Sequence, residues 1–355
     1  MSVSKILIIG NYVAGNLGDD AILGGILTEL SLLGFNGSIG ILGGELKTSS
    51  EIYKKISRAK LFPSGLRSHL NFFEKAKTKR ALDWADLVIL GGGGLMVDEE
   101  SLKAPWIWAS QARAVRKKGK PYLCYGQSIG PLHKAWNQEL AEEFFKNAKG
   151  VHVRDAASQE WLEKRGIESS LGTDPAWAWL SNQSSKHGKS KILLISLRTW
   201  ADHSKESWAS ILEASQEFCS EHSFKPVLLS MEPLNSKEQE ELNALGMELL
   251  SLDSAQSTFR AMQNASLAIT MRLHAGIFAM AAGLPTLAMS YSSKVKDQFE
   301  SLHAEGGLSV LPSKASKDEI KRHLEKLHQE GRPIFNIEKL MNLNLAFLTK
   351  MLANP

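Results

Sequence analysis

The chain has 355 residues and a formal net charge of +4, with 43% hydrophobic and 23% charged residues, which is typical of a globular protein with two domains. This small basic excess suits an anionic substrate, but it excludes the strongly basic surface that a nucleic-acid-binding protein requires. Only two cysteines occur, and the sequence has no Cys and His cluster, so we expect neither disulfides nor a metal site, and no cofactor.

The N-terminus carries no signal-peptide pattern, and the apolar runs are much shorter than the ~18 residues of a membrane span. We therefore expect a cytoplasmic protein. Two basic clusters, 75–80 and 113–120, are expected to be solvated helix faces, although either could touch an acidic membrane surface at the inner face of the membrane.

Short apolar segments alternate with amphipathic helical patterns along the first half of the chain. Helical patterns, as in 19–34 and 104–120, lie between strands predicted at 5–10, 38–44, 86–92, 121–127 and 150–155. Because strands and helices alternate, the sequence predicts a parallel sheet covered by helices on both faces.

A second series of the same kind follows a polar linker at 181–190. Its strands are predicted at 191–198, 225–231, 247–252, 266–272 and 284–291. The predicted fold class is α/β, with two Rossmann-like doubly wound domains, 1–180 and 191–330, that face a cleft in a GT-B-like arrangement. The C-terminal helices of 331–355 are expected to pack back on the first domain. Ligands of such sheets bind at the carboxyl ends of the strands.

The segment GNYVAGNLGDD at 10–20 follows the first predicted strand, where many α/β proteins bind phosphate. It matches neither the dinucleotide-binding pattern nor the P-loop pattern, which needs a lysine. Asp19 and Asp20 would repel the anion that backbone amides attract. The segment therefore predicts another kind of ligand, or two aspartates that only cap the following helix.

A run of glycines that includes Gly92, Gly93 and Gly94 is followed by three acidic residues, Asp98, Glu99 and Glu100. Glycine is tolerated where the backbone must approach another group closely. A tight crossing from strand to helix would explain the run without any ligand. The acidic residues favour a polar site.

Arg272 and His274 interrupt an apolar stretch where a strand meets a helix. The helix N-terminus offers free N–H groups and a positive dipole, so an anion site is predicted there, with a histidine that can move a proton near pH 7. Arg198 ends another strand of the same domain, and two arginines suit a ligand with two anionic groups. A buried structural Arg and His pair is the alternative interpretation.

Other polar positions are less informative. Gln127 either faces the cleft or closes a turn. Asp155 or Ser158 is expected to cap a helix, and Asp174 precedes a proline at a helix entry, so a structural role is expected for each.

Seven segments together resemble the bacterial polysaccharide pyruvyltransferase family: GNLGDDAIL, LVILGGGGLMVDE, YGQSIGPL, VRDAASQEWL, GTDPAW, ISLRTW and TMRLHAGIFAMAAGLPTLAMSYSSKVKDQFE. The resemblance runs from about residue 5 to about residue 310. The order and spacing look like those of the branch that pyruvylates secondary cell-wall polysaccharide for surface-layer anchoring. The family resemblance implies a GT-B-like fold and transfer of the enolpyruvyl unit of phosphoenolpyruvate to a sugar hydroxyl, closed as a ketal.

The resemblance also implies roles on the donor side. The arginine–leucine–histidine motif of the family stands here as Arg272, Leu273 and His274, and its arginine at the first strand of the second domain stands as Arg198. Arg198 and Arg272 match the phosphate and the carboxylate of phosphoenolpyruvate. His274 is the candidate acid that protonates C3 of the enol.

On the acceptor side, the resemblance makes Asp98 the candidate base, with Glu99 and Glu100 as alternatives. Asn16 and Asp19, with Gly18 between them, are expected to hydrogen-bond sugar hydroxyls, while Asp20 caps the helix. The glycine run and Gln127 are expected to bind substrate. The acceptor is a polysaccharide or its lipid-linked precursor.

Two other functions remain open from the sequence. A GT-B glycosyltransferase that uses a nucleotide sugar would share the fold, and Glu232 is the one candidate acid for its ribose hydroxyls. A sugar-binding protein without catalysis is the second, although the joint presence of Arg198, Arg272 and His274 argues against it.

Overall fold

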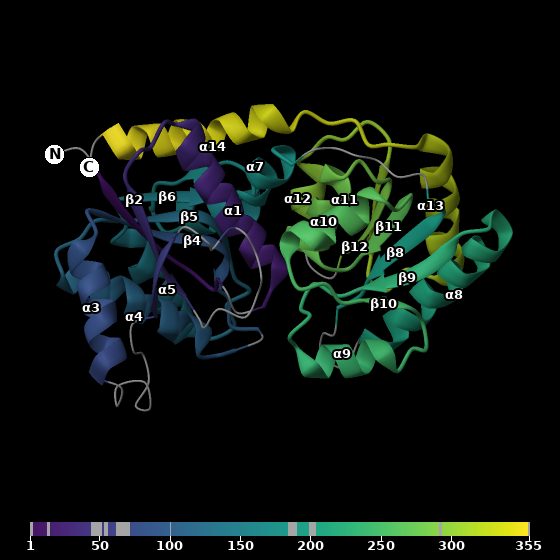
Figure 1. The fold of residues 1–355 in the computed structure, drawn as a ribbon, viewed down its shortest axis with the longest axis horizontal. Helices are drawn as coiled ribbons and strands as arrows, with labels where there is room; N and C mark the ends of the chain where they lie inside the picture. Colours follow the sequence, from purple (N-terminus) through teal and green to yellow (C-terminus); the bar gives the residue numbers. More distant parts are fainter. Residues whose placement is uncertain are drawn as a thin grey trace.

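Two α/β units lie side by side in the protein, as Figure 1 shows. The computed structural model describes residues 3–12, 15–43, 52, 56–61, 72–99, 101–183, 190–198, 204–290 and 293–353. The predicted α/β class with two doubly wound units is confirmed by the two sheets of parallel strands.

The first sheet has the strand order β3-β2-β1-β4-β5-β6-β7. Its strands are β1 Lys5–Ile9, β2 Ser38–Gly43, β3 Ser57–Lys60, β4 Leu87–Met96, β5 Tyr122–Ile129, β6 Gly150–Val153 and β7 Ser170–Leu171. Every pair in it is parallel. The short edge strands β3 and β7 were not predicted, because neither contains the apolar run that marks a buried strand.

Helices cover both faces of this sheet. They are α1 Leu17–Leu32, α3 Phe72–Trp84, α4 Ala104–Lys117, α5 Ala135–Lys146, α6 Ala156–Glu163 and α7 Ala176–Ser181. Successive residues of β1 enter opposite cores: Ile6 and Ile8 pack with α1 and α7, whereas Leu7 and Ile9 pack with the α3, α4 and α5 layer. This double burial explains why β1 reads as a continuous apolar run.

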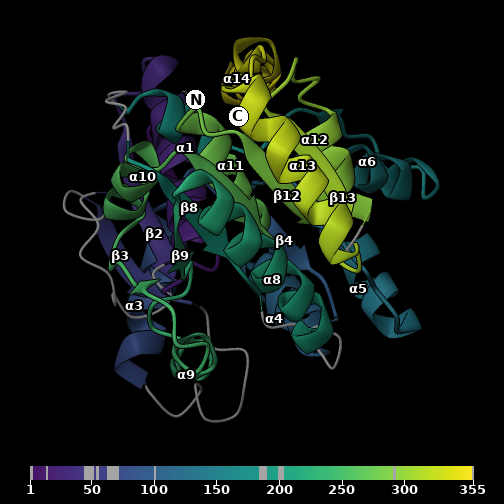
Figure 2. The same ribbon diagram turned by 90° about the vertical axis from the view of Figure 1, so that its right-hand side faces the viewer.

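The second sheet has the order β10-β9-β8-β11-β12-β13. Its strands are β8 Ile192–Ser196, β9 Lys225–Leu229, β10 Leu249–Leu250, β11 Leu267–Thr270, β12 Thr286–Ser290 and β13 Leu308–Pro312. Its helices are α8 Ser204–His222, α9 Ser236–Asn243, α10 Ala255–Gln263, α11 Leu273–Ala281, α12 Ser293–Glu300 and α13 Lys317–Glu330. Figure 2 shows α8 and α13 next to each other on one face of this sheet.

In both sheets, the order in which strands are added reverses next to the first strand. This point lies between β1 and β4 in the first sheet and between β8 and β11 in the second. Crevices form at such reversal points. The last helix, α14 Ile337–Ala353, returns across the N-terminal unit above α1 in Figure 1. Asn344 of α14 accepts a hydrogen bond from the Thr173 amide at 2.9 Å and donates one to Glu29 at 2.8 Å. Among the described helices, none is long and apolar enough to cross a bilayer.

Candidate active site

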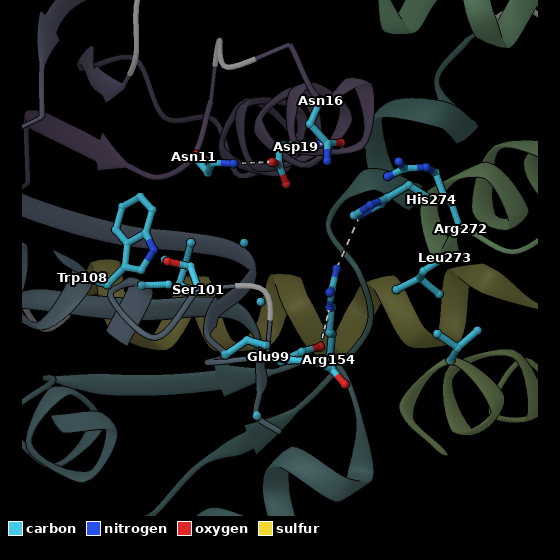
Figure 3. A pocket seen from close by; sticks show the side chains of 18 of the residues that line it. Asn11, Asn16, Asp19, Glu99, Ser101, Trp108, Arg154, Arg272, Leu273 and His274 are labelled. Atoms are coloured by element: carbon cyan, nitrogen blue, oxygen red, sulfur yellow. Dashed lines mark hydrogen bonds between the residues drawn. The ribbon is translucent and has the colours of Figure 1, made fainter. Parts of the chain in front are cut away.

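A cavity of about 510 Å³ lies at the carboxyl ends of both sheets, between the two units. Figure 3 shows polar side chains from both units pointing into it. The N-terminal unit contributes Asn11, Asn16, Asp19, Glu99, Trp108 and Arg154, and the C-terminal unit contributes Arg198, Glu232, Arg272, Leu273 and His274.

Asn16, which follows β1, connects the two units through a hydrogen bond. Asn16 caps α1, because its Oδ1 accepts hydrogen bonds from the amides of Gly18 at 2.9 Å and Asp19 at 3.3 Å. Its Nδ2 donates to Oε1 of Glu232 at 3.3 Å, across the cavity. The capping role predicted for Asp20 thus belongs to Asn16, since an Ncap residue must precede the first helical turn and Asp20 is already inside the helix and buried.

Asp19 lines the cavity on the N-terminal side. Asn11 donates a hydrogen bond from Nδ2 to Oδ2 of Asp19 at 3.0 Å. Burial raises the pKa of the Asp19 carboxyl, and the weaker opposing effects of His274 and Asn11 do not offset it. Gly18 faces the ring of His274 so closely that any β-carbon there would collide with it. Glycine at this position allows the loop and the histidine of the other unit to meet.

His274 stands in the first turn of α11 and is held by residues of the N-terminal unit. Its Nε2 lies 3.4 Å from Oδ2 of Asp174 and 3.4 Å from an Nη atom of Arg154. Arg154 and Asp174 form a buried ion pair, and the Nε of Arg154 donates to Ser128 Oγ at 2.8 Å. Burial acts to raise the pKa of Asp174, but the charge of Arg154 and the contact with His274 outweigh it and lower that pKa. Asp174 therefore stays ionised behind the histidine.

Arg272 forms ion pairs with two carboxylates of its own unit. An Nη atom lies 2.8 Å from Oε1 of Glu232, and the other bonds to Oε2 of Glu238. Burial opposes ionisation of Glu232, yet the charge of Arg272 prevails and lowers its pKa. Burial raises the pKa of Glu238 despite the same arginine. Arg272 is thus held in place before any ligand arrives, and its burial and ion pairs also fit the structural role that the sequence left open as the alternative.

Gln127, Gly93 and Gly18 are predicted site residues that do not line the cavity. Gln127 is buried, and its Nε2 donates to the Leu90 carbonyl at 3.0 Å. Gly92 and Gly93 have φ of +57° and +88°, a region that favours glycine, and a β-carbon on Gly92 would collide with Ile22 of α1. Among the glycines, Gly92 and Gly94 do line the cavity.

Asp98 does not line the cavity, which corrects the expectation that it is the acceptor-side base. It is buried, and its carboxylate accepts hydrogen bonds from the amides of His133 and Lys134 and from Nδ2 of Asn137, at 2.8 to 3.0 Å. Burial acts to raise the pKa of Asp98, but these hydrogen bonds lower it. Asp98 fixes the start of α5. Of its neighbours, Glu99 lines the cavity and Glu100 lies outside the described residues.

Arg154 and Asp174 are the site residues that the sequence reasoning did not select. Each follows a strand at the carboxyl edge of the first sheet, Arg154 directly after β6 and Asp174 shortly after β7. That position was the available signal. The expected cap is present next to it, since Asp155 Oδ1 accepts the Ser158 amide at 2.8 Å.

Known proteins resemble this chain in sequence and in fold. The profile of the polysaccharide pyruvyl transferase family matches residues 16–293. The amylovoran biosynthesis protein AmsJ of Erwinia amylovora is 25% identical, over 82% of this chain and 84% of its own length.

Two solved structures share the fold. A putative UDP-N-acetylglucosamine 2-epimerase from Listeria monocytogenes has a TM-score of 0.66 at 14% identity, over 100% of this chain and 98% of that one. A glycosyltransferase from Rickettsia africae has a TM-score of 0.59 at 14% identity, over the full length of both chains. At these identities the likeness shows the GT-B-like fold alone.

Proposed function

Because the chain belongs to the polysaccharide pyruvyl transferase family and is a transferase, we propose that it transfers a pyruvyl group from phosphoenolpyruvate to the hydroxyls of a sugar in a cell-surface polysaccharide or its lipid-linked precursor. The products are a pyruvate ketal and inorganic phosphate. The observation that carries the proposal is the cavity itself, where Arg198, Arg272 and the N-terminus of α11 face a wall of amides and carboxylates.

The C-terminal side suits the donor. Phosphoenolpyruvate carries a phosphate and a carboxylate, which guanidinium groups bind through paired N–H donors. The N-terminus of α11 adds backbone N–H groups and a positive dipole. The phosphate or carboxylate oxygens of phosphoenolpyruvate would compete with Glu232 for the guanidinium of Arg272. Glu232 therefore positions Arg272 in the free protein and gives way when the substrate binds.

His274 is the proposed general acid. It gives a proton to C3 of the enol, which becomes a methyl group, and C2 becomes an oxocarbenium-like centre that the first sugar hydroxyl attacks. Phosphate then leaves with its electron pair as the C2–O bond breaks, and a second hydroxyl adds to C2 to close the ketal. Asp174 and Arg154 hold the imidazole in place.

The N-terminal side suits a neutral polyol. Asn16 and Asp19 offer acceptors and donors to sugar hydroxyls, and these carboxylates and amides bind a polyol without repelling it. Asp19, whose pKa burial raises, and Glu99 are the two carboxylates placed to take a hydroxyl proton. Trp108 gives the same wall an aromatic surface for a sugar ring.

AmsJ is named for the biosynthesis of amylovoran, which supports a polysaccharide as the acceptor class. Within that class we propose the secondary cell-wall polysaccharide, on the strength of the motif spacing in this sequence.

A nucleotide-sugar glycosyltransferase is the second candidate, since structures with this fold include enzymes named for UDP-N-acetylglucosamine. Glu232 was the candidate acid for a ribose. Its Oε1 accepts from Arg272 and Asn16, and its Oε2 accepts from Asn235 at 2.9 Å. These partners make Glu232 a poor ribose ligand.

Thermal unfolding in the presence of ligands separates the two functions, because a ligand that binds only the folded state raises the midpoint. We expect phosphoenolpyruvate to raise Tm, and UDP or UDP-N-acetylhexosamine to leave it unchanged. At a ligand concentration of ~100 Kd, the gain is about 2.7 kcal/mol.

The matched variants are Arg198→Ala, at the cavity, and Arg260→Ala, on the exposed face of α10 in the same unit. Only the first should abolish the shift with phosphoenolpyruvate. A shift with the uridine nucleotides alone would overturn the pyruvyl-transfer proposal in favour of the glycosyltransferase.

A further inference from the structure

The first turns of α4 and α5 carry large apolar side chains that face solvent. Leu102, Trp106 and Trp136 are 51%, 44% and 56% exposed. Tryptophan is highly buried on average, so two tryptophans left in water point to a partner. We call this region the α4–α5 surface, defined by Leu102, Lys103, Trp106, Lys134 and Trp136.

Hydrogen bonds hold the two turns together. Nδ2 of Asn137 donates to the Leu102 carbonyl at 3.3 Å and to Asp98 at 3.0 Å. Asp98 also accepts the amides of His133 and Lys134. The helices α4 and α5 pack against each other in the layer below the first sheet in Figure 1. The apolar side chains therefore project from a rigid base.

The charge of this region is mainly positive. Residues 99–139 contain seven Lys and Arg residues and three Glu residues, of which Glu99 and Glu139 are exposed. Arg113 and Arg116, toward the end of α4, pair with Glu143. Lys103 and Lys134 are exposed within the α4–α5 surface, and Nζ of Lys134 lies 6.0 Å from the ring centroid of Trp136. Exposed tryptophans beside lysines are the combination that a membrane interface with anionic headgroups attracts.

The opposite side of the same segments forms the cavity. Ala104, Ile107 and Trp108 line it from α4, and Pro131 lines it from the segment that precedes α5. Trp106 stands between these positions in the sequence and faces solvent. Whatever binds the α4–α5 surface therefore lies at the rim of the acceptor side.

We propose that the α4–α5 surface docks on a bilayer with anionic headgroups, and that docking presents the cavity to an acceptor saccharide carried by a membrane lipid. The docking stands on the surface alone, and only its use for a lipid-linked acceptor rests on the proposed function. Two exposed tryptophans with a lysine close to each, in a region of net positive charge, favour an anionic bilayer over a protein partner, which more often pairs charges of both signs.

The test is flotation of the full-length protein with vesicles of phosphatidylcholine alone or of equal parts phosphatidylcholine and phosphatidylglycerol. The protein should float with the anionic vesicles. Its binding to the neutral vesicles should be weaker by roughly tenfold or more. Raising the salt to ~0.5 M should reduce the binding, because it screens the lysines.

The decisive variant is Trp106→Ser with Trp136→Ser, which should lower vesicle binding by roughly tenfold or more. Its matched control is Leu32→Ser with Leu343→Ser, which removes two apolar side chains that are 61% and 46% exposed on the α1 and α14 layer. The control should bind as the wild type does. Circular dichroism and Tm establish that both variants fold.

Wild-type protein that ignores anionic vesicles, or a tryptophan variant that floats as well as the control, overturns the proposal. A wild-type dimer that the tryptophan variant converts to a monomer, measured by light scattering, would make this surface a contact between two copies instead. The Tm shift with phosphoenolpyruvate is measured on the same variants, so failure of docking is distinguished from failure of the proposed reaction.

Discussion

The two sheets share the order of six strands, to which the first sheet adds β7, but they offer opposite chemistry to the cavity between them. At the reversal point beside β1, the N-terminal unit presents Asn16 and the carboxyl of Asp19. At the equivalent point beside β8, the C-terminal unit presents Arg198 and Arg272. The shared topology decides where a ligand binds, and the residues that follow the strands decide which kind it is.

The two units also treat a buried glutamate differently. Glu238 in the C-terminal unit is bonded to Arg272. Glu29 in the N-terminal unit accepts hydrogen bonds from two neutral donors, Tyr125 at 2.8 Å and Asn344 at 2.8 Å, and its burial raises its pKa to about 8. Burial raises the pKa of both carboxyls, but at Glu238 the charge of Arg272 opposes that rise, whereas at Glu29 only two hydrogen bonds from neutral donors oppose it.

The largest effect is expected from Arg272→Ala, which removes a cation from the C-terminal side of the cavity. The unpaired, buried Glu238 should lower the free energy of unfolding by about 3–5 kcal/mol, and kcat/KM for phosphoenolpyruvate should fall by more than ~10². Adding Glu238→Gln should restore much of the Tm and none of the donor binding. Normal kinetics in this double variant would exclude Arg272 from donor binding.

Asp174→Asn tests whether the N-terminal unit controls the acid of the other unit. Because the imidazole loses the carboxylate that positions it, kcat should fall by ~10²-fold while KM for phosphoenolpyruvate changes little. In a His274→Ala background the same substitution should have little further effect, since the two residues act as a unit. Additive losses in kcat would mean that Asp174 is only structural.

Two aspartates of the N-terminal unit should respond differently to the same change. Asp19→Asn should lower kcat by ~10-fold or more with little change in Tm, because its carboxylate faces the cavity. Asp98→Asn should lower the free energy of unfolding by about 1.5–3 kcal/mol through weakened charge-assisted hydrogen bonds, with kcat per folded molecule unchanged. The opposite pattern would return Asp98 to the site.

The last prediction concerns Glu29 and the pH dependence of stability. Its pKa is raised from 4.5 to about 8 in the folded protein, so the folded state binds more protons than the unfolded state between these values. The Glu29 contribution to stability should therefore be complete below pH 4.5 and be lost as the pH rises toward 8. Glu29→Gln should flatten this part of the Tm profile. An identical slope in both proteins would show that another group causes it.

Much of the fold follows from sequence periodicity alone. Apolar runs of strand length located ten of the strands, and Asp155 marked the start of α6 through its own side chain. Three strands were missed. β13 alternates apolar residues and was detectable. The other two are instructive: β7 has two residues and β3 is polar, so neither carries a pattern that distinguishes it from a loop. Pairing with a neighbouring strand defines both.

The site was harder to derive than the fold. The positions of Arg198, Arg272 and His274 after strands placed them at the correct edge of a parallel sheet. Asp98 occupies an equally suggestive position, yet its carboxylate turns toward the amides that begin α5. Sequence position gives the edge of the sheet on which a residue lies, but it does not give the direction of the side chain.

The sequence by itself determined the alternation of strands and helices and the place of Arg272 at a helix N-terminus, because each depends on residues close together in the chain. Of the predicted linker at 181–190, residues 184–189 lie outside the described residues. Only the tertiary structure decided that Arg154 and His274, 120 residues apart, would meet over Asp174. That contact depends on how the two sheets face each other. The orientation of the two sheets depends on contacts between the units. One of these contacts is between Gly18 and the ring of His274, which leaves no room for a β-carbon at position 18.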